Sequence, residues 1–192
     1  LDSVEVAGLY NLRGLDNWSY YALNEGGLTY WNNTGVGNET RANHTPMQRL
    51  IMDSLHFMVE ELHVDGFRFD LAGILGEQDL NYNYWHEDPL DSTLGLIAND
   101  LVLQEHNVRI IAEPWTAGGS YNPLNGAYPA ASNRADYGWG EWNAHFRDVW
   151  RSMLNEDDYV LSRAEGAVDA GGALTGSYDL IAHNGRQPWH SV

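Results

Sequence analysis

Two short apolar segments constrain the fold most, because each ends in a carboxylate and each follows a segment with helical spacing. Residues 64–70 read VDGFRFD, and residues 108–113 read VRIIAE. The helix-like segments before them cover residues 45–63 and 92–106. Helices that alternate with strands predict a parallel sheet covered by helices. We therefore expect an α/β fold in which both carboxylates lie at the carboxyl edge of one sheet.

The helix over residues 45–63 has the clearest start signal. Thr45 is a good N-cap, Pro46 suits the first helical position, and Gln48 completes a capping box. Apolar residues then recur at helical spacing. The expected buried stripe consists of Met47, Leu50, Ile51, Leu55, Met58 and Leu62.

Weaker signals predict the other elements. A second helix is expected over residues 92–106, although Gly95 weakens it. A short strand near residues 137–142 should lead into a third helix. The expected shared face of that helix consists of Phe146, Val149, Trp150, Met153 and Leu154. Loops are expected at residues 1–44, 81–89 and 116–137.

The side chains of residues 64–70 alternate in a way that suits a barrel. Phe67 and Phe69 point to one face, whereas Arg68 and Asp70 point to the other. A barrel strand has this character when apolar groups lie under the outer helices and a polar group lies at the mouth. Asp70 and Glu113 are 43 residues apart, which fits one barrel repeat with an enlarged loop.

Two carboxylates at neighbouring strand ends suit glycoside hydrolysis. One carboxylate attacks or stabilises the sugar, and the other protonates the leaving oxygen. The alternative is structural: Asp70 pairs only with Arg68, and Glu113 caps a loop. The residues alone leave both interpretations open.

Composition narrows the partners. The net charge is −17, with ten Arg and no Lys, which disfavours nucleic acid and anionic membranes and leaves a high-salt habitat open. Eight Trp and eleven Tyr fit stacking on sugar rings or, equally, a well-filled core. The chain has no Cys, and its eight His show no metal-ligand spacing. We therefore expect no metal and no cofactor.

Two motifs resemble conserved segments of the α-amylase superfamily, glycoside hydrolase family 13. DGFRFDLA at 65–72 resembles its nucleophile segment, and IIAEPW at 110–115 resembles its general-acid segment. Four further segments are similar to the isoamylase and glycogen-debranching branch of that superfamily. They are RGLDNWSYY at 13–21, NTGVGN at 33–38, GWGEWNAHFRD at 138–148 and GRQPWHSV at 185–192.

This resemblance implies a partial (β/α)8 TIM barrel, covering about strands four to six with their helices. It also implies a retaining hydrolase that cleaves α-1,6 branch linkages in glycogen, amylopectin or limit dextrins. Asp70 matches the nucleophile and Glu113 the acid/base, while Arg68 matches the arginine that keeps the nucleophile ionised. Further substrate-binding residues are expected to be Trp115, Tyr21 and Asn38.

The family also has a third catalytic carboxylate, the Asp of a His-Asp pair. The match of GRQPWHSV places that Asp just beyond Val192, so we do not assign its role to Asn184 in AHNG. The first conserved segment of the family is expected before Leu1. Residues 1–192 are therefore expected to form part of the catalytic barrel domain, with the N-terminal and C-terminal parts of the enzyme absent from the chain.

Three other functions remain open. The first is a pullulanase or another α-amylase relative acting on α-glucans. The second is a non-catalytic glucan-binding subunit on the same fold, although such a subunit has no need of Asp70, Glu113 and Arg68. The third is an unrelated α/β binding protein. A branched α-glucan is the expected partner, and the sequence predicts neither oligomeric state, branch-length preference, calcium binding nor localisation.

Overall fold

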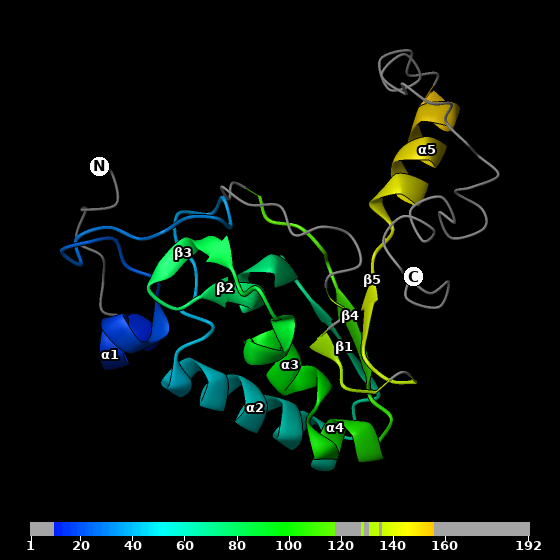
Figure 1. Cartoon of the computed structure of the whole chain (residues 1–192), viewed down its shortest axis with the longest axis horizontal. Coiled ribbons are helices and arrows are strands. Elements are labelled where there is room, and N and C mark those ends of the chain that lie inside the picture. The colour runs from blue at the N-terminus through cyan, green and yellow to red at the C-terminus, as the bar shows by residue number, and fades with distance from the viewer. Residues whose placement is uncertain (1–9, 118–127, 129–130, 135, 156–192) are drawn as a thin grey trace.

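A parallel sheet forms the centre of the fold. The computed structural model describes residues 10–117, 128, 131–134 and 136–155 (Figure 1). Three strands pair in the order β1-β4-β5, and both pairings are parallel. Their bounds are Gly66–Phe69 for β1, Arg109–Ala112 for β4 and Trp139–Glu141 for β5. The predicted α/β class with a parallel sheet is confirmed.

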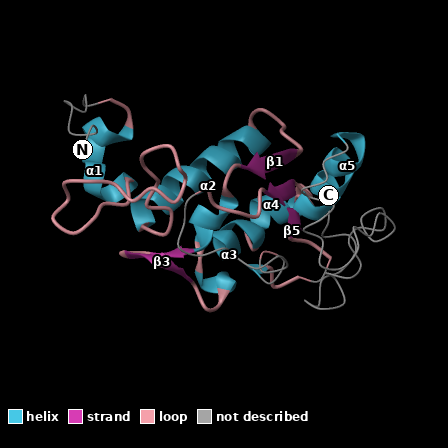
Figure 2. Ribbon diagram, turned by 90° about the horizontal axis from the view of Figure 1, so that it is seen from above, coloured by secondary structure: helices cyan, strands magenta, loops and turns pink. Residues whose placement is uncertain are grey.

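Three helices share one apolar core with these strands. They are α2 (Thr45–Glu60), α3 (Thr93–Ala98) and α4 (Leu101–Glu105), and α2 is the longest of them (Figure 2). Trp139 of β5 is fully buried, and its indole Nε1 donates to the carbonyl oxygen of Leu94 in α3 at 2.9 Å. This bond ties the sheet to the helical layer through the interior.

Helix α2 begins one residue earlier than its start signal predicted. His44 is the N-cap, and no side chain caps the helix, so Thr45 is already helical. Gln48 forms no capping box, because its side chain donates to Thr93 Oγ1 of α3 at 3.2 Å. The tertiary contact replaces the local one.

The predicted buried stripe on α2 is confirmed at Leu55 and, in part, at Ile51, but not along its whole length. The residues buried on this helix are Met52, Leu55 and Val59. Of the predicted stripe, Leu50, Met58 and Leu62 are exposed. Apolar residues surround more than half of the helix, so their spacing alone did not decide which face meets the core.

The predicted helix over residues 92–106 is broken into α3 and α4. Asp100 interrupts it, because its side chain accepts a hydrogen bond from the backbone N–H of Leu103 at 3.0 Å and so caps a new helix. Aspartate competes with helical hydrogen bonding in this way.

Parts of the predicted loops are ordered elements. Helix α1 spans Leu12–Tyr20, with non-helical backbone angles at Asp16, and none of its residues is buried. Strands β2 (Glu77–Gln78) and β3 (Asn81–Trp85) pair as an antiparallel hairpin. Short 3₁₀ helices cover Ala72–Gly76 and Pro89–Asp91. No apolar stripe marks α1 in the sequence, and β2 is too short to show a period.

The predicted third helix is confirmed as α5 (Ala144–Asn155), which follows β5 directly. Two residues of its predicted buried face, Phe146 and Leu154, are exposed. In the described part of the chain, no helix combines the length and apolar character needed to cross a membrane. Asn184 and the GRQPWHSV segment lie outside the described residues.

Candidate active site

The carboxyl ends of the three parallel strands carry the candidate catalytic groups. Phe69 is in register with Ala112, and Ala112 is in register with Glu141. The next residue of each strand is therefore Asp70, Glu113 or Trp142. These three residues form a row across one edge of the sheet.

Arg68 connects all three members of this row. Its Nη1 donates to Asp70 Oδ1, and its Nη2 lies 3.1 Å from Glu113 Oε1. The guanidinium carbon lies 4.2 Å from the centroid of the Trp142 ring, within the range of a cation–π contact. One cation thus holds both carboxylates, and one aromatic face covers that cation.

The two carboxylates differ in exposure. The side chain of Asp70 is 75% exposed, whereas that of Glu113 is 14% exposed. An exposed carboxylate can reach a carbon of an incoming substrate. An enclosed carboxyl group whose position is fixed suits proton transfer, which depends on hydrogen-bond geometry.

Backbone hydrogen bonds fix Glu113 in place. Its N–H donates to the carbonyl oxygen of Phe69 at 3.0 Å, and its Oε2 accepts from the N–H of Leu71 at 2.8 Å. Leu71 has a φ of 43° and a ψ of 51°, in the left-handed region that L-residues rarely adopt. Such strain persists only where the surroundings impose it, and it gathers at functional sites.

The negative charge of Glu113 contributes to raising the pKa of two nearby side chains, Tyr128 and Arg147. Burial, with the negative charge of Glu113 as a smaller cause, raises the pKa of Tyr128 above its usual value, so this phenol stays neutral. A hydrogen bond to Asp148 is the main cause that raises the pKa of Arg147, and the charge of Glu113 adds to it. The Arg147 guanidinium carbon lies 5.2 Å from the centroid of the Trp115 ring.

A pocket of about 270 Å³ opens beside Asp70. Its walls come from residues 34–40 on one side and residues 69–75 on the other, and it includes both Asn38 and Asp70. Tyr21 is not part of its lining. The backbone of Tyr21 pairs with that of Thr40, a wall residue, so Tyr21 supports the wall from behind.

The structure therefore unites most of the predicted site residues. Arg68 contacts both Asp70 and Glu113, and Asn38 shares a pocket with Asp70. Trp115 follows Glu113 in the chain, and its N–H donates to the Glu113 carbonyl oxygen at 2.9 Å.

Sequence reasoning missed Trp142 as a site residue. Its signal was present, because Trp142 lies in GWGEWNAHFRD at the end of a predicted strand. The contact between its ring and Arg68 depends on the sheet order β1-β4-β5, which puts β5 beyond β4. The sequence patterns predicted a parallel sheet but not the order of its strands.

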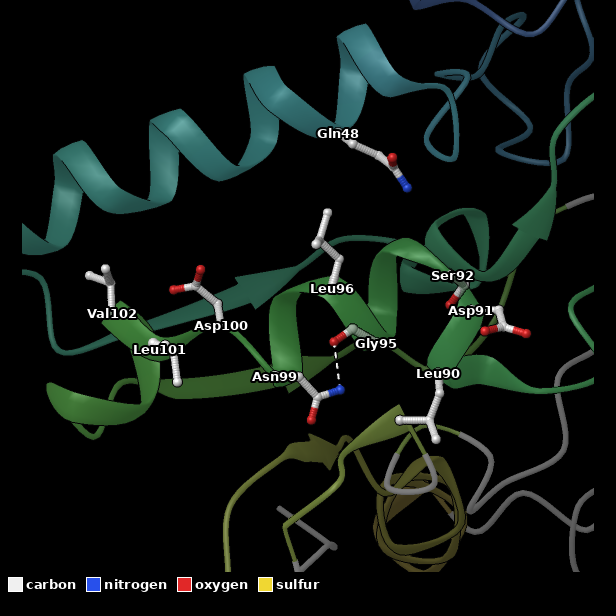
Figure 3. A pocket seen from close by; sticks show the side chains of 10 residues that line it. All are labelled: Gln48, Leu90, Asp91, Ser92, Gly95, Leu96, Asn99, Asp100, Leu101 and Val102. Atoms are coloured by element: carbon white, nitrogen blue, oxygen red, sulfur yellow. Dashed lines mark hydrogen bonds between the residues drawn. The ribbon is translucent and has the colours of Figure 1, made fainter.

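A second pocket lies between α2 and the pair α3–α4 (Figure 3). Leu96 and Gln48 face one another across it, and Asp100 lies at its edge. None of the predicted site residues lines it. In residues 10–117, 128, 131–134 and 136–155, no cluster of three or more His, Cys, Asp or Glu could hold a metal ion.

The chain is similar in sequence to debranching enzymes along nearly its whole length. It is 36% identical over 205 residues to an isoamylase of Pseudomonas sp. (strain SMP1), a match covering 97% of this chain and 25% of the relative. It is 38% identical over 185 residues to the glycogen operon protein GlgX homolog of Mycobacterium bovis (95% and 22% covered). It is 34% identical over 207 residues to the chloroplastic isoamylase SU1 of Zea mays (98% and 24% covered). The chain thus spans about a quarter of the length of these relatives.

Solved structures of pullulanases resemble the fold. The pullulanase of Anoxybacillus sp. LM18-11 complexed with maltotriose matches with a TM-score of 0.58 at 26% identity, covering 84% of this chain and 21% of that one. The pullulanase of Bacillus acidopullulyticus matches with a TM-score of 0.51 at 30% identity, covering 67% and 14%. No family model matches the chain.

Proposed function

Because the chain belongs to the isoamylase and glycogen-debranching branch of the α-amylase superfamily, we propose that it carries catalytic residues of a debranching enzyme. The reaction is hydrolysis, with retention, of α-1,6 branch linkages in glycogen, amylopectin or their limit dextrins. The observation that carries the proposal is the contact of Arg68 with both Asp70 and Glu113 at one sheet edge. In this proposal β1, β4 and β5 are about strands four to six of a (β/α)8 barrel.

Asp70 is the proposed nucleophile. Its carboxylate attacks the anomeric carbon, and the bond from that carbon to the branch-point oxygen breaks as the glycosyl-enzyme ester forms. The exposure of Asp70 and its place in the pocket support this role. The ion pair with Arg68 keeps the carboxylate oriented.

Glu113 is the proposed acid/base. It gives its proton to the departing oxygen in the first step and takes a proton from the attacking water in the second. The backbone bonds that fix Glu113 support this role, because proton transfer requires a defined donor position. Trp115 and Asn38 are proposed to contact the glucan, and Tyr21 to support the wall that carries Asn38.

A pullulanase is the second candidate, because the structural neighbours carry that name. Both enzymes cleave α-1,6 bonds, so the same residues would serve either. Substrate choice separates them: a debranching enzyme of the isoamylase kind releases linear chains from amylopectin, whereas a pullulanase also cuts pullulan.

The test uses the full-length protein and two variants. Asp70→Asn should lower turnover of amylopectin by roughly a thousandfold or more, because an amide cannot form the ester intermediate. Glu113→Gln should slow amylopectin about a hundredfold or more, yet slow an aryl glycoside with a good leaving group much less.

Asp136→Asn is a matched control for the first variant. Asp136 is also 75% exposed and also pairs with an arginine two residues earlier, Arg134, but it precedes β5 and lies at the other end of the sheet. Equal slowing of both substrates by Glu113→Gln would contradict the acid role. Glucan binding by the wild type without hydrolysis would favour a non-catalytic subunit instead.

A further inference from the structure

A pair of buried carboxyl groups lies behind the pocket that contains Asp70. The side chains of Glu39 and Glu77 belong to residues that are 1% and 3% exposed. One amide nitrogen, Asn33 Nδ2, lies 3.3 Å from Glu39 Oε1 and 2.7 Å from Glu77 Oε1, although 38 positions separate the two glutamates in the chain. Ionising both of two neighbouring carboxyl groups in a protein interior has a large cost in free energy, so the pair retains one proton between them.

Asn33 is the third member of this cluster and is also buried. Its backbone N–H donates to Glu39 Oε2 at 2.5 Å, and its side-chain Nδ2 donates to Glu77 Oε1 at 2.7 Å. The same amide nitrogen lies 2.9 Å from the carbonyl oxygen of Tyr82 in β3. Asn33 thus joins its own loop to the hairpin β2–β3.

The cluster reaches both sides of the candidate active site. Glu39 lines the pocket beside Asp70, as do its neighbours Asn38 and Thr40. The carbonyl oxygen of Asn33 accepts a hydrogen bond from the N–H of Ala117 at 2.9 Å. Ala117 lies four residues after Glu113, so this bond holds the segment that leaves the proposed acid.

We propose that Glu39 is a positioning residue of the glucan cleft. The proton that it shares with Glu77 keeps Asn33 in place, and Asn33 fixes the wall beside Asp70 relative to the segment after Glu113. When that proton is lost, two negative charges repel each other in the interior, Asn33 shifts, and the cleft loses affinity for glucan. This inference rests on the proposed function, since it concerns the same site.

The charges around the pair support a titration near neutral pH. Burial raises the pKa of Glu39 to about 7, and the hydrogen bonds from Asn33 and with Glu77 offset part of that effect. Burial is also the main cause that raises the pKa of Tyr82 to about 12, so this phenol stays neutral.

Two further charged groups face the cluster, and they neutralise each other. Arg41 is buried, and its Nε lies 2.5 Å from Asp79 Oδ1. Across the pocket, Asp70 is paired with Arg68. Glu39 is the carboxyl group in this cluster whose pKa burial raises to about 7.

The experiment measures glucan affinity against pH in the full-length protein. Maltotetraose is the probe, its Kd is determined by calorimetry, and KM for amylopectin is measured alongside. From about pH 5.5 to about pH 8, the wild-type Kd should rise at least about fivefold, the lower end of typical coupling between two equilibria. The Kd of Glu39→Gln should rise less than about twofold, because the amide has no proton to lose and a second negative charge cannot form beside Glu77.

Two further variants sharpen this result. Glu77→Gln should also flatten the pH dependence, and the double variant should add nothing, because either amide alone removes the shared proton. Glu61→Gln is the matched control, since Glu61 is an exposed glutamate just after α2. That control should keep the wild-type dependence.

The outcomes separate this inference from the proposed function. A Kd that rises as steeply in Glu39→Gln as in the wild type overturns the positioning role. An alkaline loss confined to kcat, with Kd and KM unchanged, also overturns it, because a cleft that loses affinity for glucan must show the loss in Kd. A wild type that binds maltotetraose with the expected pH dependence but hydrolyses no α-glucan overturns only the proposed reaction. A wild type whose Kd does not rise with pH overturns the inference even if the variants fail to fold.

Discussion

At the scale of single residues, Arg68 determines how the two proposed catalytic carboxylates meet. Its guanidinium is a planar fork with several donors, so it can contact Asp70 and Glu113 at once. A lysine ammonium is a compact point charge on a flexible stem and cannot reproduce that geometry. Trp142 also stacks on the guanidinium plane and would lose that contact.

Arg68→Lys is therefore expected to lower kcat/KM on amylopectin by roughly ten- to a hundredfold. The loss corresponds to one charge-assisted hydrogen bond of about 1.5–3 kcal/mol. The melting temperature should change little, because the Arg68 side chain is one-third exposed. Steady-state kinetics and a thermal melt check both parts. Arg134→Lys is the control, and near-wild-type activity in Arg68→Lys would rule out the bridging role.

Glu39 should also leave a mark on stability. Its pKa is raised in the folded protein to about 7 from an ordinary value of 4.5, so the native state holds the proton longer than the unfolded chain. The native protein therefore loses stability as pH rises from 4.5 towards 7, by a total on the order of 3 kcal/mol, and the penalty is constant above that range.

Glu39→Gln lacks this titration. The melting temperature of the variant minus that of the wild type should therefore increase between about pH 4.5 and pH 7, and then level off. Melts at half-unit pH steps measure this difference and cancel the titrations that both proteins share. A difference that stays constant with pH would show that Glu39 titrates normally.

The sequence predicted the centre of the site better than its support. Asp70 and Glu113 were predicted as candidates because parallel strands bring their carboxyl ends to one edge, and the family resemblance added Arg68. Glu39 was not predicted, because no periodic pattern in the sequence relates it to Asn33 and Glu77. The three residues meet only in the folded chain. Buried polar clusters of this kind become visible only when the segments are placed together.

At the scale of elements, Gly95 has a packing role that its low helix propensity conceals. In the sequence it only weakened a predicted helix. In the structure, a Cβ at this position would lie 2.2 Å from the carbonyl oxygen of Leu90, which is backbone and cannot rotate away. The glycine allows α3 to pack against the turn before it.

Gly95→Ala is expected to destabilise the protein by about 1–3 kcal/mol, the usual cost of overpacking, despite the better helix propensity of alanine. Urea unfolding of the full-length protein measures the change. Gly26→Ser supplies a comparison, because a Cβ there meets no atom within 4 Å and only its positive φ of 86° opposes the substitution. A stabilising effect of Gly95→Ala would contradict the close approach.

Asp100 explains why one predicted helix became two. Its Oδ1 caps α4 through Leu103, and its Oδ2 lies 2.9 Å from His56 Nε2 on α2. Asp100→Ala should therefore cost about 1–2 kcal/mol, the usual price of a lost N-cap. Asp100→Asn keeps the capping oxygen and should recover most of that loss in the same unfolding assay. Equal losses in both variants would assign the effect to the His56 contact alone.

Sequence patterns predicted β1, β4 and α2, each of which contributes apolar residues to the core. Strands β1 and β4 are short apolar runs, and α2 has a long periodic stripe. Helix α1 buries none of its residues, and β2 has only two, so neither offers a pattern to read. Periodic spacing of apolar residues indicates a buried face, and an element held in place by polar contacts shows no such spacing.

At the scale of the whole molecule, the pairing of strands β1 and β5 decides whether the sheet can be part of a barrel. Within the described residues, β1 and β5 each pair on one side only, with β4 between them. Parallel sheets occur almost only with both faces covered, and a barrel has no free edge. Our proposal that the sheet belongs to a (β/α)8 barrel therefore requires further strands beside β1 and β5.

Backbone geometry identifies the amides that test this. The carbonyl oxygens of Asp65 and Phe69 accept hydrogen bonds from β4 segment residues, so these odd-numbered residues of the β1 segment face β4. Directions alternate along a strand, and the N–H of Arg68 therefore points away from β4. On the other side, the N–H of Trp142 donates to the Ala112 carbonyl oxygen, so the N–H of Trp139 points away from β4.

The final prediction is that the outward amide of Arg68 is protected in the full-length protein. If a further strand pairs with β1, the N–H group of Arg68 exchanges as slowly as that of Phe67, which faces β4 in either case. If β1 is an edge strand, the Arg68 amide exchanges orders of magnitude faster than that of Phe67, because only water opposes it at this exposed residue. Trp139 is fully buried, so its amide would be protected in both cases. Residue-resolved hydrogen exchange at Arg68 distinguishes the two results. Fast exchange at Arg68 would refute the barrel while leaving the Arg68 bridge between Asp70 and Glu113 intact, and would require another fold to bring the rest of the cleft together.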